Sequence, residues 1–133
     1  MKITARVKNG PGMHKAEVST SEASKTIDIL PKENGLGSSV NGGELLFLAL
    51  ATCYCNDVYR EAEKRGISID GVAVEVVGEF GAVGEAARNI VYKVEVESDA
   101  DEKTIRDLLL HTDTVAEIQN TLRSGASVTL ELK

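Results

Sequence analysis

The sequence has only two cysteines and no long hydrophobic run, and each of these shortages excludes a class of protein. With only Cys53 and Cys55, the chain cannot be a disulfide-rich scaffold. A membrane-spanning helix needs about 18 or more consecutive apolar residues, and the longest apolar candidate, residues 45–53, is far shorter. Residues 1–6 lack the apolar segment of a signal peptide, so we expect a cytoplasmic protein without a membrane span.

Basic residues are also fewer than acidic residues. The chain has 15 lysines and arginines against 21 acidic residues, which gives a formal net charge of −6. Proteins that bind nucleic acid usually present a basic surface to the phosphate backbone, so we expect no nucleic-acid partner. The length of 133 residues suits a single domain covering residues 1–133.

The hydrophobic periodicity predicts an α+β fold with antiparallel sheets. Alternating residues predict strands over 2–8, 13–20 and 25–30, with turns at 9–12 and 22–24. A long helix is predicted from Asn41 to a terminating glycine, Gly66. Strands are then predicted over 72–80 and 89–97, and a helix over 101–111 with Asp99 or Asp101 as its N-cap. A short helix capped by Asp113 and a final strand over 126–132 complete the predicted order.

The long helix carries its own start signal. Asn41 as N-cap and Glu44 three residues later form a capping box. Residues 45–51 are apolar on every side of the helix, so we expect this half to be enclosed by protein. Residues 59–65 are mostly polar, and we expect that half to emerge into water.

Cys53 and Cys55 lie on this helix about 200° apart, so they cannot form a disulfide with each other while the helix persists. Each could be a buried packing residue or a reactive thiol. Cys53 is about three turns from the helix N-terminus, too far for the helix dipole to activate it. A cation from another part of the fold would be needed, and the first hairpin offers the candidates Arg6, Lys8, His14 and Lys15.

The residues with metal-binding side chains do not follow a known spacing. Cys53, Cys55, Asp57, His14 and His111 match no zinc pattern, so we expect no metal site. His14 is expected to pack on a strand and His111 to lie at a helix C-terminus. The glycines before the long helix lack the Lys-Ser/Thr pair of a phosphate-binding loop, and no cofactor is expected.

Residues 41–53 read Asn-Gly-Gly-Glu-Leu-Leu-Phe-Leu-Ala-Leu-Ala-Thr-Cys, which resembles the core signature of the OsmC/Ohr family. That signature runs Asn-Pro-x-Glu-Leu-Leu, then small and apolar residues, then a cysteine inside a long central helix. The predicted order of elements, the loop over 32–40 and the stretch 119–122 fit as well, so the resemblance covers most of the chain. Small members of the family often carry a cysteine and an aspartate at the spacing of Cys53 and Asp57.

The resemblance implies an OsmC-like fold with a long buried central helix, assembled as an intertwined homodimer with active sites at the subunit interface. Family members reduce organic hydroperoxides with a cysteine at the position of Cys53. Other family groups have no counterpart here. Gly43 stands where the family has an active-site glutamate, Ala116 stands where it has the second cysteine, and Lys8 is nearest to its hairpin arginine.

Two main hypotheses follow. In the first, the chain is an OsmC-like redox or stress-response protein in which Cys53 reduces a small organic peroxide and an external thiol restores it. Lys8, His14 or Lys15 would stabilise the thiolate. In the alternative, a non-catalytic OsmC-like dimer binds a small apolar ligand at the subunit interface, and the missing glutamate, arginine and second cysteine favour this reading. A purely structural or partner-binding dimer is a third reading.

Overall fold

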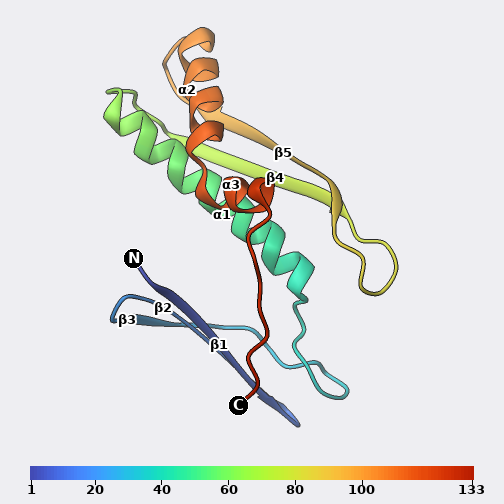
Figure 1. Ribbon diagram of the computed structural model, residues 1–133. Coiled ribbons are helices and arrows are strands. Elements are labelled where there is room, and N and C mark those ends of the chain that lie inside the picture. Colours follow the sequence, from blue (N-terminus) through green and yellow to red (C-terminus); the bar gives the residue numbers. More distant parts are fainter. The chain divides into compact units, whose positions relative to one another are not determined.

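The computed structural model describes residues 1–133, and the chain divides into two compact units, Met1–Leu45 and Leu46–Lys133. The predicted α+β class with antiparallel sheets is confirmed (Figure 1). No helix combines the length and the apolar composition that crossing a bilayer requires.

The first unit is a three-stranded antiparallel sheet in the order β1-β2-β3. Its strands are β1 (Ile3–Gly10), β2 (Met13–Thr20) and β3 (Ala23–Ile27). Gly12 has a φ of 68°, which explains why a glycine occupies the β1–β2 turn. The second turn lies one residue earlier than predicted, because Ser21 takes the positive φ of 54° and β3 already begins at Ala23.

The segment after β3 is a loop held to the first hairpin by one side chain. The Asn9 amide donates to the carbonyl of Gly37 and accepts from its N–H, both at 3.0 Å. At the end of this loop, Asn41 Oδ1 accepts from the Glu44 N–H at 2.8 Å, and Glu44 Oε1 accepts from the Asn41 N–H at 3.0 Å. These reciprocal bonds satisfy two backbone donors at the start of the long helix.

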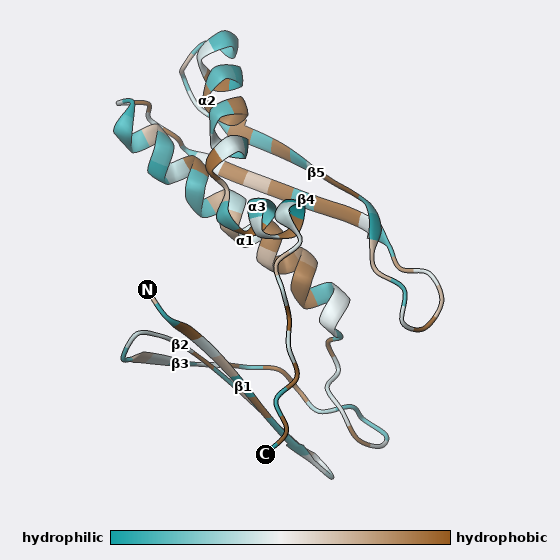
Figure 2. Cartoon of the chain, in the orientation of Figure 1, coloured by the Kyte–Doolittle hydropathy of each residue, from teal (hydrophilic) through white to brown (hydrophobic).

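The long helix α1 (Gly42–Lys64) ends as predicted before Gly66, which has a φ of 66°. The expected distribution of burial along α1 is confirmed only in part. The apolar first half buries Leu50 but leaves Leu45 and Leu48 exposed. In the polar segment 59–65, Tyr59 and residues 63–65 are exposed as predicted, whereas Glu61 and Ala62 are buried. Figure 2 shows the contrast in hydropathy along α1, which is largely brown after its first turn and largely teal toward its C-terminal end. Glu61 can be buried because its carboxylate pairs with Arg60 and Lys64.

The strands β4 (Gly71–Glu79) and β5 (Arg88–Glu97) form a two-stranded antiparallel sheet. Burial alternates along both strands, so one face packs on the core and the other meets solvent. The register shifts between Val77 and Glu79, at Gly78. A Cβ at Gly78 would lie 2.6 Å from the ring of Phe47, so this position has no room for a side chain.

Two helices complete the second unit, α2 (Glu102–Val115) and α3 (Glu117–Ser124). Asp101 is the N-cap of α2 and accepts from the Thr104 N–H at 2.7 Å, which decides between the two predicted caps. The prediction that Asp113 caps the next helix was wrong. Asp113 lies within α2, where its carboxylate accepts from Tyr92 and Arg123, and Ala116 is the N-cap of α3.

The core of this unit lies between α1, α2, the α2–α3 junction and the inner face of the sheet. Its fully buried members are Tyr54, Val58, Ala62, Leu108 and Ala116. The inner-face residues of β4 and β5 pack against them. This core therefore fixes the second half of α1 against α2 and the junction, which is where the candidate site lies.

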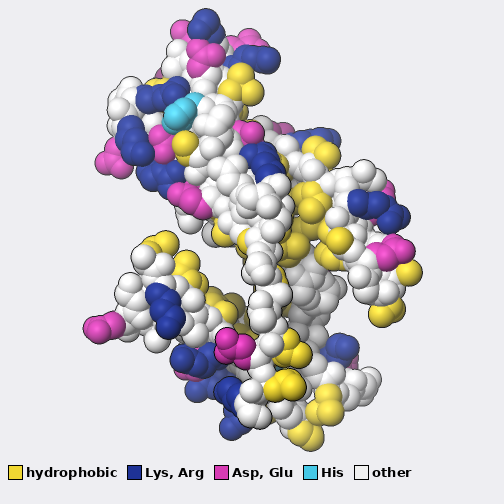
Figure 3. Space-filling model, viewed as in Figure 1, with side chains coloured by type: hydrophobic (Ala, Val, Ile, Leu, Met, Phe, Trp, Pro, Cys, Tyr) yellow, Lys and Arg dark blue, Asp and Glu magenta, His cyan; other side chains and the backbone are white.

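The predicted final strand over 126–132 does not form. Residues 126–133 are irregular, and Figure 1 draws the segment as a coil. Val128, Leu130 and Leu132 are largely exposed, and Figure 3 shows hydrophobic side chains at the surface. An alternating sequence becomes a strand only when another strand supplies the hydrogen bonds, and this segment pairs with none.

Candidate active site

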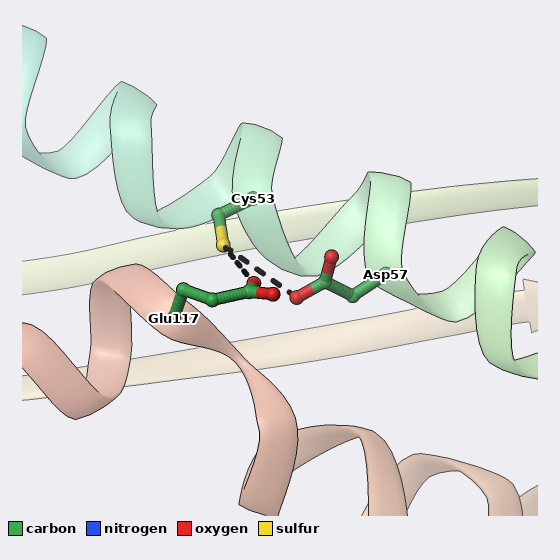
Figure 4. A group of neighbouring side chains, drawn as sticks. All are labelled: Cys53, Asp57 and Glu117. Carbon is green, nitrogen blue, oxygen red and sulfur yellow. Dashed lines mark hydrogen bonds between the residues drawn. The ribbon is translucent and has the colours of Figure 1, made fainter. Parts of the chain in front are cut away.

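Cys53 lies at the centre of α1, beside two carboxylates that the fold brings to it. Its thiol donates to Asp57 Oδ2 at 3.6 Å and lies 3.9 Å from Glu117 Oε2 (Figure 4). Asp57 shares the helix face of Cys53 because it is four residues further along. Glu117 comes from the first turn of α3, far away in the sequence.

A single arginine links these carboxylates. Arg60 Nη1 lies 2.8 Å from Asp57 Oδ1 and 3.4 Å from Glu117 Oε1. Its Nε also donates to Glu61 at 3.0 Å. Arg60 therefore neutralises carboxylates of two helices, while its guanidinium makes no hydrogen bond to the sulfur. The sequence analysis looked for a cation only on the first hairpin and did not include Arg60.

Glu61 is the second buried anion of the cluster. It accepts hydrogen bonds from Arg60 and, at 3.1 Å, from Lys64, and His111 Nε2 lies 3.3 Å from its Oε2. The hydrogen bond from Arg60, followed by that from Lys64, lowers the pKa of Glu61 to about 2. His111 was expected at a helix C-terminus. Instead α2 continues to Val115, and His111 faces the carboxylate of Glu61.

The surroundings of Cys53 favour the neutral thiol. Burial raises its pKa most, and the negative charge and hydrogen bond of Asp57 and the charge of Glu117 raise it further. Only a hydrogen bond at the backbone of Ile118 acts in the opposite direction. Within the second unit, the site therefore holds a protonated sulfur next to groups that can accept its proton.

The two carboxylates beside the sulfur differ in basicity. Burial raises the pKa of Asp57, although Arg60 partly offsets this effect. The pKa of Glu117 is lowered, first by a hydrogen bond from its own backbone N–H and then by Arg60. Burial thus favours the protonated form of Asp57, whereas the backbone hydrogen bond and Arg60 favour the ionised form of Glu117.

Cys53, Asp57 and Glu117 also form a group that the spacing analysis missed. Their ligand atoms all lie within 4.8 Å of one another, although no short sequence motif links them. Such a sulfur and oxygen set could hold a thiophilic cation after loss of the thiol proton. Arg60 already supplies positive charge at this place.

The other predicted site residues lie in the first unit. Lys8 and Lys15 are opposite each other in the β1–β2 ladder, Lys15 pairs with Glu17 at 3.6 Å, and His14 Nδ1 lies 3.1 Å from the Asn9 amide. Their role beside Cys53 stays a prediction. Asn41 and Glu44 are the reciprocal pair at the start of α1 described above.

Two further positions bear on the chemistry. Cys55 faces a different hollow, with Ala51, Thr52 and Val74, and both cysteines are free. Ala116, where the family resemblance places a second cysteine, is fully buried at the α2–α3 junction. Its neighbour Glu117 is the residue that approaches the sulfur of Cys53.

Comparison with known proteins identifies the fold around this site. The family model described as OsmC-like protein matches residues 35–131, which is more than half of the chain. The chain belongs to the OsmC-like family. No curated protein gives a significant match to this OsmC-like chain.

Solved structures share the OsmC-like fold at low sequence identity. An OsmC-like protein from Mycoplasma pneumoniae is 21% identical with a TM-score of 0.65, over 93% of this chain and 87% of that one. The OhrB organic hydroperoxide resistance protein of Bacillus subtilis is 20% identical with a TM-score of 0.53, over 99% and 96%. An organic hydroperoxide resistance protein OsmC from Legionella pneumophila, also described as a predicted redox protein, is 16% identical with a TM-score of 0.58, over 92% and 90%.

Proposed function

We propose that this OsmC-like protein is a homodimeric, thiol-dependent peroxidase that reduces organic hydroperoxides through Cys53. The observation that carries the proposal is the contact of the Cys53 thiol with Asp57 and Glu117, because it pairs a nucleophile with a proton acceptor. Two of the similar structures are those of organic hydroperoxide resistance proteins. We further propose that both units form one domain and that the protein is cytoplasmic, where its two thiols would stay reduced.

The reaction requires a proton transfer before the sulfur can attack. Asp57, whose pKa is raised by burial, would take the thiol proton. The thiolate would then attack one oxygen of the hydroperoxide, so that an S–O bond forms and the O–O bond breaks. The departing alkoxide takes a proton and leaves as an alcohol, and Cys53 remains as a sulfenic acid.

A second step must restore the thiol. Position 116, where the family has its second cysteine, is an alanine in this chain, and Cys55 faces away from Cys53. We therefore propose an external reductant. One thiol molecule condenses with the sulfenic acid and releases water, and a second displaces Cys53 as the thiol with formation of the reductant's disulfide.

Replacement of Cys53 tests the activity. We expect native protein and the matched control Cys55→Ser to consume cumene hydroperoxide faster than hydrogen peroxide, with dithiothreitol or dihydrolipoamide as reductant. Cys53→Ser should lose this turnover because serine cannot form the sulfenic acid. Equal rates for Cys53→Ser and native protein would contradict the proposal.

One observation favours a second candidate function. The pKa of Cys53 is raised rather than lowered, which is the opposite of what most reactive cysteines need. A non-catalytic OsmC-like dimer that binds a small apolar ligand at the subunit interface would need no thiolate. The absence of turnover in native protein in the assay above would favour this second function.

The homodimer has its own support and its own test. Leu48 on α1 is 60% exposed, and Val128 and Leu130 of the C-terminal segment are exposed still more. Apolar surface of this kind is typical of protein interfaces. We expect sedimentation velocity at micromolar concentration to give a dimer, and a stable folded monomer would contradict it.

A further inference from the structure

A small pocket in the second unit is separate in its lining from the candidate active site. It has a volume of about 220 Å³ and contains side chains from α1, β5 and α3. The lining residues are Leu50, Ile90, Tyr92, Gln119, Leu122 and Arg123. Cys53, Asp57 and Glu117 are not among them, so the chemistry of the sulfur does not explain this pocket.

The apolar walls set the size and character of an occupant. Most of the lining surface comes from carbon atoms of residues such as Leu50, Ile90 and Leu122. An apolar protein cavity of about 150 Å³ holds one benzene molecule. The present pocket therefore suits one aromatic ring with a small substituent.

Two of the polar lining residues already have partners. The Tyr92 hydroxyl donates to the carboxylate of Asp113. Arg123 Nη2 donates to the same carboxylate at 2.7 Å, and its Nη1 donates to the Asp113 carbonyl at 3.1 Å. The positive charge of Arg123 is thereby balanced, so the pocket presents no free charge to attract an ion.

Gln119 differs from Tyr92 and Arg123, because one of its polar atoms has no hydrogen-bond partner. Its side chain is almost fully buried, with 3% of the residue exposed, and its Nε2 donates to the carbonyl of Leu50 at 3.0 Å. This bond fixes the amide orientation, because a carbonyl can only accept. The amide oxygen Oε1 then has no hydrogen-bond donor, although it is buried. An unpaired buried acceptor is rare and costly.

We propose that this pocket binds one small uncharged molecule that has a ring-sized apolar body and a single O–H or N–H donor. The body fills the space between Leu50, Ile90 and Leu122, and the donor binds Gln119 Oε1. Phenols and indoles have this chemistry. The proposal rests on the pocket and on Gln119, and it holds whether or not Cys53 is catalytic.

Phenol and anisole, two probes of similar size, test the proposal on the full native protein by NMR titration. Phenol has a donor and anisole has only an acceptor. We expect phenol to bind roughly tenfold more tightly than anisole, although anisole is the more hydrophobic of the two. Equal binding of the two probes, or tighter binding of anisole, would overturn the proposal, and so would the absence of phenol binding.

Three variants assign the effect to this pocket. Gln119→Met keeps the side-chain length without the acceptor, so anisole should then bind more tightly than phenol. Leu122→Phe fills the space and should abolish the binding of both probes. Leu110→Phe, at an exposed site on α2 outside the pocket, is the matched control and should bind as the native protein does. A phenol preference that survives in Gln119→Met contradicts the proposal. If Gln119→Met does not fold, unchanged phenol binding by folded Leu122→Phe contradicts it equally.

Discussion

The Arg60→Met variant is expected to melt roughly 5 to 10 °C below the native protein at pH 7. Asp57 and Glu61 have side chains only 6% exposed, and Arg60 is the cation that contacts both. Its removal leaves Asp57 buried without its cationic partner. Glu61 keeps Lys64, and Arg60 itself is 39% exposed, so the destabilisation is smaller than for a fully buried ion pair.

The pH dependence of this decrease in melting temperature identifies its cause. The pKa of Asp57 is raised in the folded protein and that of Glu61 is lowered. Once acid protonates both groups, Arg60 has no anion to neutralise there, so the gap in melting temperature should narrow as the pH falls. Arg106→Met, at an exposed position on α2, is the control and should melt within a degree or two of native protein. A gap in melting temperature that stays the same in acid would show that lost packing, rather than charge, causes the effect.

Removal of the two carboxylates beside Cys53 should make its sulfur several-fold more reactive at neutral pH. In the double variant Asp57→Asn and Glu117→Gln, the charges that raise the pKa of Cys53 are gone, while its burial remains. The pKa should therefore fall, and more thiolate should be present at pH 7. The rate of alkylation by iodoacetamide against pH, measured in a Cys55→Ser background, reports this change.

The design also separates two roles of Asp57. Glu63→Gln changes an exposed carboxylate on the same helix and should leave the alkylation curve in place. If Asp57 acts as the proton acceptor in peroxide reduction, the double variant should alkylate faster and yet reduce cumene hydroperoxide no faster than native protein. An alkylation midpoint that stays in place or moves to higher pH would contradict the electrostatic account of Cys53.

The parts of the fold that follow from local signals could be predicted. The capping pair Asn41 and Glu44, the terminating Gly66 and the alternation in β4 and β5 all depend on neighbours within a few residues. The long helix and the α+β class followed from them, and the resemblance in residues 41–53 led to the family. The prediction of a final strand over 126–132 was wrong because alternating residues show only that a segment can pair with a strand. Whether a partner strand is present does not follow from the same segment.

Only part of the candidate site could be predicted from the sequence, for a similar reason. Arg60 stands three residues after Asp57, a spacing that predicts an ion pair on one helix face, so this contact could have been found. Glu117 could not, because only the packing of α3 brings it to Cys53. The polar composition of residues 59–65 predicted exposure, which holds for Tyr59 and residues 63–65. It did not predict the burial of Glu61, because composition alone does not show that a buried anion will meet cations.

The close approach of Phe47 to Gly78 links two positions that are distant along the chain. Because a β-carbon at position 78 would collide with the ring, a mutation there alone would be selected against. A smaller side chain at position 47 would remove the closest contact and leave only Ile90 Cγ1, at 3.1 Å, so the two positions should vary together among descendants of this chain. The packing of one aromatic ring against a bulged strand thus restricts the order in which mutations can accumulate, with the change at position 47 coming first.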